Sequence, residues 1–275
     1  MGGAIAAFIF IWWYGTRTAA RAATIDEKNR QIADLQEKNS QLLRKMEAET
    51  EPKKLDQSAM KTYKVKRTSK QITLFTDSIS ELKTADIWVS SENTEMQMAR
   101  FHDRSISGTI RYLGAKKTDD NKVAGDSIAI DLHSVKQSGN YFEPGTVLVT
   151  QAGELLRTHG VKKIFHVAAV QGQVGAGFRP IQNIDNCVTN ALQRADAADY
   201  KNVGYESIAL PLFGTGTAEG ELQEIVKPLL QRAILYLLNH QNSNIRRIYF
   251  LTWLDVEFEA CKAVLDGDAR VSQVA

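Results

Sequence analysis

The stretch that most constrains the fold is 207–220, SIALPLFGTGTAEG. It begins with a short apolar run typical of a buried parallel strand, and Pro211 ends that run. The glycine-containing turn 214–217 follows, and from Glu221 apolar residues recur at helical spacing. A strand, a turn and a helix N-terminus in this order present free backbone N–H groups at the positive end of a helix dipole, where phosphate groups bind. The alternative is that the turn only connects the strand tightly to the helix.

The composition narrows the possible functions. The 275 residues include 34 basic and 32 acidic ones, and a net charge of +2 gives no reason to expect nucleic acid as a partner. With 43% hydrophobic residues, the chain can bury a substantial core. Cys187 and Cys261 stand alone in helical-looking segments, which indicates a reducing compartment and ordinary packing. Neither the cysteines nor the five histidines have metal-ligand spacing, and no cofactor is indicated.

Residues 1–23 have the features of a membrane anchor. Residues 2–14 carry no charge and end in the aromatic run WWY, and Arg17 and Arg21 follow. These 13 residues rise only about 20 Å as a helix, against a hydrocarbon core of about 30 Å. The helix would therefore extend through Ala23, with the arginine side chains reaching the interface. We expect this segment to contact membrane lipid and the arginines to keep the rest of the chain in the cytoplasm; the alternative is an apolar helix that packs on a partner protein.

Residues 24–51 show a heptad pattern. The residues that recur every seven positions are Ile25, Ile32, Asn39 and Met46, with Leu35 and Leu42 three positions after two of them. Asn39 at an a position favours a parallel pair in register, so we expect a homo-oligomer through residues 24–50. Lys28 at one d position weakens the seam, and the alternative is a single solvated helix. Residues 52–64 are expected to be a linker.

From about Tyr63 onward, the sequence alternates between strand and helix patterns. The candidate strands are 72–75, 87–90, 127–131, 146–150, 163–169, 207–210 and 247–252, and the candidate helices are 95–113, 151–158, 180–198, 221–239 and 255–265. This alternation predicts an α/β fold with a largely parallel sheet that is covered on both faces. Ligands bind such sheets outside the carboxyl ends of the strands, so the loops after Ser90, Ala169 and Leu210 should meet in one crevice.

Several motifs occur in a recognisable order. They are TDSI at 76–79, ADIWVSSEN at 85–93, SGTIRYLG at 107–114, PGTVLVT at 144–150, IFHVA at 164–168 and ALPLFGTG at 209–216. Together they resemble a macro domain, the α/β/α module that binds ADP-ribose and its relatives. The resemblance covers residues 65–267 and implies a three-layer domain with a mostly parallel mixed sheet, which we assign to residues 65–275.

The resemblance also implies roles for individual residues. Asp77 would accept a hydrogen bond from the adenine amino group, and the Asn93 amide would face the distal ribose. The residues that would hold the diphosphate are Gly214, Thr215, Gly216 and Thr217, with Gly175, Gly177 and Phe178 closing the pocket from the other side. Asp77 equally suits a helix N-cap, and His166, in an apolar strand, is expected to be a core residue.

The sequence departs from the family pattern around the distal ribose. Residues 90–92, SSE, stand where the family has Asn and two small residues, and a glycine-rich loop is replaced by the helical-looking segment 94–104, TEMQMARFHDR. Ser107 stands where hydrolytic members have an aspartate that positions the attacking water, and a serine without a neighbouring base cannot do this. Arg100 and Arg104 would share one face of a helix, or would merely be solvated. The candidates for the distal pocket are Glu92, Arg100, Arg104 and Ser107.

Three functions follow from these expectations. The leading one is a membrane-anchored cytoplasmic sensor that binds an ADP-ribose-type nucleotide without hydrolysing it. This layout is similar to the transmembrane–macro effectors of Thoeris-type anti-phage systems. The alternatives are a membrane-tethered ADP-ribosyl or O-acetyl-ADP-ribose hydrolase, with Glu92, Glu95 or Asp103 as its acid–base group, and a coiled-coil scaffold with a vestigial pocket.

Overall fold

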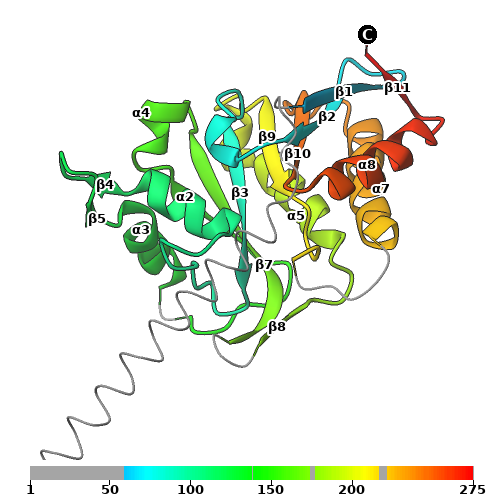
Figure 1. The fold of residues 1–275 in the computed structure, drawn as a ribbon. Helices are drawn as coiled ribbons and strands as arrows, with labels where there is room; N and C mark the ends of the chain where they lie inside the picture. Colours follow the sequence, from blue (N-terminus) through cyan, green and yellow to red (C-terminus); the bar gives the residue numbers. More distant parts are fainter. Residues whose placement is uncertain (1–58, 138, 174–176, 217–221, 275) are drawn as a thin grey trace, which may run out of the picture. The chain divides into compact units, whose positions relative to one another are not determined.

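The protein is described by a computed structural model over residues 59–137, 139–173, 177–216 and 222–274. Within these residues, the main sheet has the strand order β11-β1-β2-β10-β9-β3-β7-β6, with β8 paired to β7 (Figure 1). Its strands are β1 (Ala59–Val65), β2 (Gln71–Thr76), β3 (Ile87–Asn93), β6 (Val147–Gln151), β7 (Lys163–Gln173), β8 (Gly177–Pro180), β9 (Ser207–Pro211), β10 (Arg247–Thr252) and β11 (Val271–Gln273). The strands β4 (Lys116–Lys117) and β5 (Val123–Gly125) form a separate pair.

The centre of the sheet is parallel. Strands β2, β10, β9, β3 and β7 run in the same direction. The outer pairings of β1 with β2 and β11, and of β7 with β6 and β8, are antiparallel. Every residue of β9 is buried, as expected for a parallel strand covered on both faces. The prediction of a mostly parallel mixed sheet is therefore confirmed.

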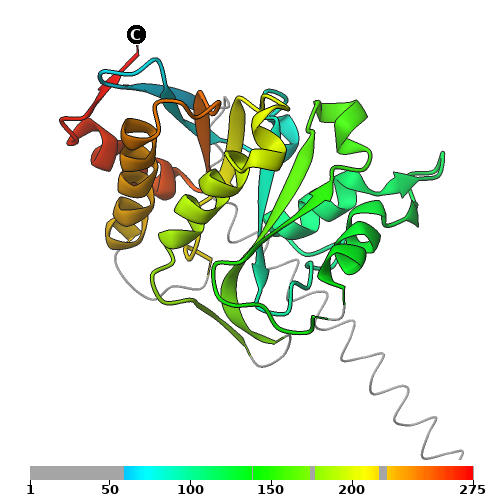
Figure 2. The same ribbon diagram turned by 180° about the vertical axis from the view of Figure 1, so that it is seen from behind.

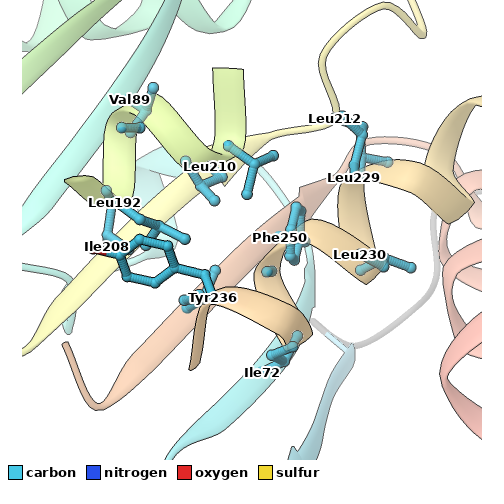
Figure 3. Close-up of a cluster of buried hydrophobic side chains, with 14 of the residues drawn as sticks. Ile72, Val89, Leu192, Ile208, Leu210, Leu212, Leu229, Leu230, Tyr236 and Phe250 are labelled. Carbon is cyan, nitrogen blue, oxygen red and sulfur yellow. The ribbon is translucent and has the colours of Figure 1, made fainter. Parts of the chain in front are cut away.

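Helices cover both faces of the sheet (Figures 1 and 2). One face carries α2 (Ile106–Gly114), α3 (Ser127–Lys136), α4 (Leu155–His159) and the short 3-10 turn η1 (Ile79–Glu81), and the other carries α5 (Asn186–Ala195), α6 (Ala198–Lys201), α7 (Leu222–Asn239) and α8 (Asp255–Asp266). Successive strand residues point to opposite faces, so the apolar residues of one strand serve two cores. Leu210 and Phe250 belong to the larger core together with Leu229 of α7 (Figure 3), whereas Ala209 and Tyr249 belong to the smaller one.

Two expected elements are wrong. Residues 127–131, which we expected to be a strand, form the first half of α3. The Asp126 side chain accepts a hydrogen bond from the Ala129 N–H at 3.2 Å and thereby caps the helix, and Ile128 and Leu132, four residues apart, bury one helical face. The helix expected from residue 95 begins only at Ile106, after the N-cap residue Ser105.

The segment 94–104 is irregular for local reasons. Met96 has φ of 51°, in the left-handed region, which interrupts a right-handed helix. The Asn93 side chain accepts a hydrogen bond from the Gln97 N–H at 2.9 Å, and the Asp103 N–H donates to the Arg100 carbonyl oxygen in a tight turn. Side-chain and turn hydrogen bonds thus replace helical ones along this segment.

The described residues begin at Ala59, within the segment that we expected to be a linker. Strand β1 begins at Ala59 and pairs with β2, so part of the segment that we expected to be a linker belongs to the sheet. The anchor expected at 1–23 and the coiled coil expected at 24–51 lie outside the described residues. Among the helices of the described part, none combines the length and apolarity that crossing a bilayer requires.

Candidate functional site

A pocket of about 680 Å³ opens at the carboxyl ends of the parallel strands. Its walls come from the loops that follow β2, β9 and β10, from the end of β3, and from the segment 94–104 together with the start of α2. Val170 of β7 and Phe178 of β8 close one side. The crevice predicted after the strands containing Ser90, Ala169 and Leu210 is therefore present.

The strand order determines the order of chemical groups along the pocket. Asp77 follows β2, Trp253 follows β10, Gly214 follows β9, and Asn93 ends β3. These strands are consecutive neighbours in the sheet. Because paired strands lie about 4.8 Å apart, the ends of β2 and β3 are separated by about 14 Å. A carboxylate, an indole, a glycine turn and an amide thus follow one another across one opening.

The β2 end of the pocket is formed by Asp77 and Trp253. Asp77 Oδ1 accepts a hydrogen bond from the Ser78 N–H at 2.6 Å, but the N-cap of η1 is Ser78, so the alternative role of Asp77 as a helix N-cap is wrong. Trp253 is 59% exposed although it lines the pocket, and sequence reasoning missed it. Glu257 fixes this loop, since its carboxylate accepts the N–H of Trp253 at 2.6 Å and that of Leu254 at 3.1 Å.

The glycine turn after β9 lines the middle of the pocket. Gly214 has φ of +90°, a conformation that favours glycine, and a Cβ there would lie 3.1 Å from Ile184 Cδ1. A Cβ on Gly216 would meet no atom of the described residues within 4 Å. Thr215 bends the turn back, because its N–H and Oγ1 donate to the Leu212 carbonyl oxygen at 3.4 and 3.1 Å.

The remaining residues expected around the diphosphate divide into three groups. Phe178 lines the pocket from β8. Gly177 begins β8 but is not among the residues that line the pocket. Gly175 and Thr217 lie outside the described residues.

Asn93 lines the pocket but already has a partner in its own chain. Its Oδ1 accepts the Gln97 N–H at 2.9 Å, and its Nδ2 donates to Gln97 Oε1 at 3.1 Å. Gln97 also lines the pocket. One oxygen lone pair and one amide hydrogen of Asn93 remain beyond these two bonds, so the amide can still contact a ligand.

The two arginines of the segment 94–104 do not share a helix face. Arg100 pairs with Asp103 through an Nη2–Oδ1 distance of 3.1 Å, and its hydrogen bonds hold the pKa of Asp103 below the usual value. Arg100 does not border the pocket, whereas Arg104 does. The expectation that Arg100 and Arg104 share one helix face was wrong because the helix begins only at Ile106.

A buried polar network lies beneath the β3 end of the pocket. The Glu92 carboxylate is 2% exposed and accepts hydrogen bonds from Ser90 Oγ at 2.6 Å and Ser107 Oγ at 2.9 Å. His166 Nδ1 lies 3.1 Å from Glu92 Oε1, and His166 Nε2 lies 3.0 Å from Thr150 Oγ1. His166 is buried as expected, but it is part of a polar network and not of an apolar core.

This network corrects the sequence-based view of Ser107. Ser107 does have a carboxylate beside it, although the two residues are 15 positions apart. Its Oγ also accepts a hydrogen bond from the Ala99 N–H at 3.1 Å, which ties the segment 94–104 to α2. The local signal of the network was Glu92 itself, a carboxylate near the end of a strand whose first three residues are apolar.

Comparison with known proteins agrees with this architecture. Residues 121–228 match the family model of the macro domain. The Oceanobacillus iheyensis macrodomain with ADP superposes with a TM-score of 0.56 at 15% identity, covering 77% of this chain and 97% of that one. A variant of the same protein with ADPR has a TM-score of 0.54 at 16% identity, covering 76% and 97%. The Trypanosoma brucei macrodomain in complex with ADP has a TM-score of 0.50 at 18% identity, covering 70% and 68%.

The match over residues 121–228 and the solved structures together show that this chain contains the macro-domain fold. At these identities, the solved structures establish the fold alone. No curated protein sequence matches the chain significantly.

Proposed function

We propose that this domain binds an ADP-ribose-type nucleotide along the pocket. The observation that carries the proposal is the order of groups across the strand ends, Asp77 and Trp253 first, then the Gly214 turn, then Asn93. A carboxylate accepts from the adenine amino group, and an indole face stacks on a base with a contribution of about 1–3 kcal/mol. The turn brings backbone N–H groups to a diphosphate, and an amide pairs with ribose hydroxyls. Macrodomains of the same fold have been solved with ADP and ADPR, which supports this choice of ligand.

We further propose that the domain binds this ligand without hydrolysing it. The best-placed base is Glu92, but its carboxylate is already held by contacts with Ser90, Ser107 and His166. Ser107 Oγ also accepts a hydrogen bond from the Ala99 N–H at 3.1 Å, which engages one of the lone pairs that a nucleophilic hydroxyl would use.

One observation favours the second candidate, a hydrolase. Ser107 Oγ lies 2.9 Å from Glu92 Oε2, which is the separation expected of a hydroxyl nucleophile and its base. In that reading the hydroxyl would attack the acyl carbon or the anomeric carbon on the distal ribose while the bond from that carbon to the leaving group breaks. Glu92 would take the hydroxyl proton and return it to the leaving group, and water would then hydrolyse the covalent intermediate.

Calorimetry and mass spectrometry on the same samples separate these functions. The full-length protein is titrated with ADP-ribose and incubated with O-acetyl-ADP-ribose and with ADP-ribosylated protein. Saturable binding with unchanged ligand supports the binder. Multiple turnovers that disappear in the Glu92→Gln variant would replace it with the hydrolase, and the absence of both binding and turnover would favour the scaffold.

We also propose that residues 1–23 anchor the chain in a membrane and that residues 24–51 pair in parallel beneath it. The uncharged run 2–14 with arginines after it supports the anchor, and Asn39 at an a position supports the pair. The domain would then report a nucleotide signal, as in the anti-phage systems that this layout resembles.

Two measurements test this arrangement. Protease added outside intact cells should leave the domain whole, and the protein should require detergent for extraction. Full recovery in the soluble fraction without detergent would contradict the anchor. Sedimentation should show an oligomer that Asn39→Leu strengthens, and a monomer at high concentration would contradict the coiled coil.

A further inference from the structure

The Glu92 carboxylate is placed to contact a ligand in spite of its burial. Glu92 is among the residues that line the pocket, although it is 2% exposed. Burying a carboxylate is costly unless donors surround it. Here Ser90 Oγ and Ser107 Oγ donate to it, and the His166 ring is within hydrogen-bond distance.

His166 acts as a positioning residue for this carboxylate. It comes from β7, which neighbours β3 in parallel, and the register pairs Ser90 with His166. When Nδ1–H donates to Glu92, Nε2 is left to accept the Thr150 hydroxyl hydrogen at 3.0 Å. Both ring nitrogens then have partners, so the ring holds the carboxylate in one orientation.

The carboxylate keeps unused acceptor capacity on one oxygen. Glu92 Oε1 accepts from Ser90 at 2.6 Å and lies near His166 at 3.1 Å, whereas Oε2 accepts from Ser107 alone among the described residues. A carboxylate oxygen can accept about two hydrogen bonds. Oε2 can therefore accept one more donor, and the pocket is the space from which a ligand can supply it.

The charges around the pocket favour a cationic donor. Among the described residues that line it, the charged ones are Asp77, Glu92, Asp103, Glu257 and Arg104. Glu257 is engaged by backbone N–H groups and Asp103 by Arg100, which leaves Glu92 as the acid beside Asn93. A carboxylate or phosphate placed there would be repelled, and a cation would gain a charge-assisted hydrogen bond.

We infer that the pocket selects ADP-ribose derivatives whose distal ribose carries a cationic N–H donor, which Glu92 recognises. The inference rests on the proposed function, because it uses the distal ribose position beside Asn93. It adds the chemical class of the substituent and assigns recognition to Glu92, with Ser90, Ser107 and His166 holding it.

The test compares three synthetic ligands of similar size by calorimetry on the full-length protein. They carry 2-aminoethyl, ethyl or carboxymethyl groups on the anomeric oxygen of the distal ribose, and ADP-ribose itself is the reference. We expect the aminoethyl compound to bind about tenfold more tightly than the ethyl compound, and the carboxymethyl compound about tenfold more weakly, because a charge-assisted hydrogen bond is stronger than a neutral one and like charges repel.

Variants assign the preference to a residue. Glu92→Gln keeps the shape of the side chain and removes its charge, so the three derivatives should then bind with similar affinities. The control is Glu143→Gln, at an exposed position outside the pocket lining, which should preserve the wild-type order of affinities. His166→Gln should weaken the ranking while ADP-ribose still binds. The order of the three affinities in the wild-type protein tests the preference for a cationic substituent even if a variant is unstable.

Failure of this inference and failure of the proposed function give different binding results. Binding of ADP-ribose with equal affinities for the three derivatives, or a preference for the carboxymethyl compound, would overturn this inference alone. The absence of binding by every nucleotide would overturn the proposed function and this inference together.

Discussion

Arg111 Nη1 donates a hydrogen bond of 2.9 Å to the carbonyl oxygen of Ala99, 12 residues earlier in the chain. The same guanidinium donates from Nε to Asp126 Oδ2 at 2.7 Å and lies 4.5 Å from the Phe101 ring centroid. Helix α2 thereby holds the irregular segment 94–104 against the pocket. A wall without helical hydrogen bonds thus depends on side chains from neighbouring elements.

Replacing Arg111 should loosen this wall. Arg111→Lys keeps the charge but loses the planar set of donors that binds Ala99 and Asp126 together. Losing about 1.4 kcal/mol of local stabilisation should speed amide exchange across 94–104 by about tenfold. Hydrogen exchange by mass spectrometry measures this. The matched control is Arg157→Lys, whose exposed pairing with Glu154 should contribute little; equal exchange in both variants would contradict the role of Arg111.

The two glycines of the turn after β9 should respond differently to alanine. Gly214→Ala places a Cβ at φ of +90° and should cost about 1 kcal/mol or more in the free energy of unfolding. In Gly216→Ala the added Cβ meets no atom within 4 Å in the part of the chain that the structure describes, so stability should change by less than about 0.5 kcal/mol while nucleotide affinity falls. Urea unfolding and calorimetry separate the two effects. Unchanged affinity in Gly216→Ala would mean that no diphosphate approaches this position.

Trp253 should contribute stacking energy to nucleotide binding. Because stacking of a base on an aromatic ring is worth about 1–3 kcal/mol, Trp253→Ala should weaken ADP-ribose binding by roughly tenfold or more, and Trp253→Phe by less. Calorimetry gives the affinities. Val256→Ala, also at an exposed apolar position of the same region, is the control. Equal affinities for Trp253→Ala and the wild type would place the base elsewhere.

Asp86 should make stability depend on acid pH. It joins the starts of β3 and β9, since its Oδ2 accepts the N–H groups of Glu206 at 2.8 Å and Ser207 at 3.1 Å, and its Oδ1 lies 2.8 Å from Lys162 Nζ. Burial acts to raise the pKa of Asp86, but hydrogen bonds from Lys162, the Glu206 N–H and Ser207 lower it below the usual value.

The sign of the effect follows from that lowered pKa. The stabilisation is complete above the unfolded pKa of about 3.9 and is lost as the pH falls through the folded pKa. Asp86→Asn should therefore cost about 2 kcal/mol at pH 7, and its difference from the wild type should shrink below about pH 4. Urea unfolding at both pH values is the measurement, with Asp119→Asn as the exposed control. A difference that stays constant with pH would contradict this role of the charge.

The sequence by itself determined those features that depend on local patterns. The apolar runs of β2, β9 and β10 predicted buried parallel strands. The glycine-containing sequence after β9 predicted a turn that lines the pocket. The periodicity of α7 predicted its start to within one residue and its end at Asn239. These features could be predicted because strand period, helix period and turn chemistry are properties of neighbouring residues.

Tertiary structure decided what local patterns leave open. Residues 127–131 are apolar enough for a strand, but the Asp126 cap and the packing of Ile128 and Leu132 select a helix. Segment 94–104 has helical composition, yet bonds to Asn93, Ser107 and Arg111 fold it irregularly.

The contact of Glu92 with His166 joins residues 74 positions apart, and that of Ser107 with Glu92 joins residues 15 apart. No local pattern predicts such contacts, because the order of strands in the sheet and the placement of α2 bring these side chains together. The sequence therefore indicated a nucleotide pocket, while only the packing of β3, β7 and α2 placed a buried, hydrogen-bonded carboxylate at one end of it.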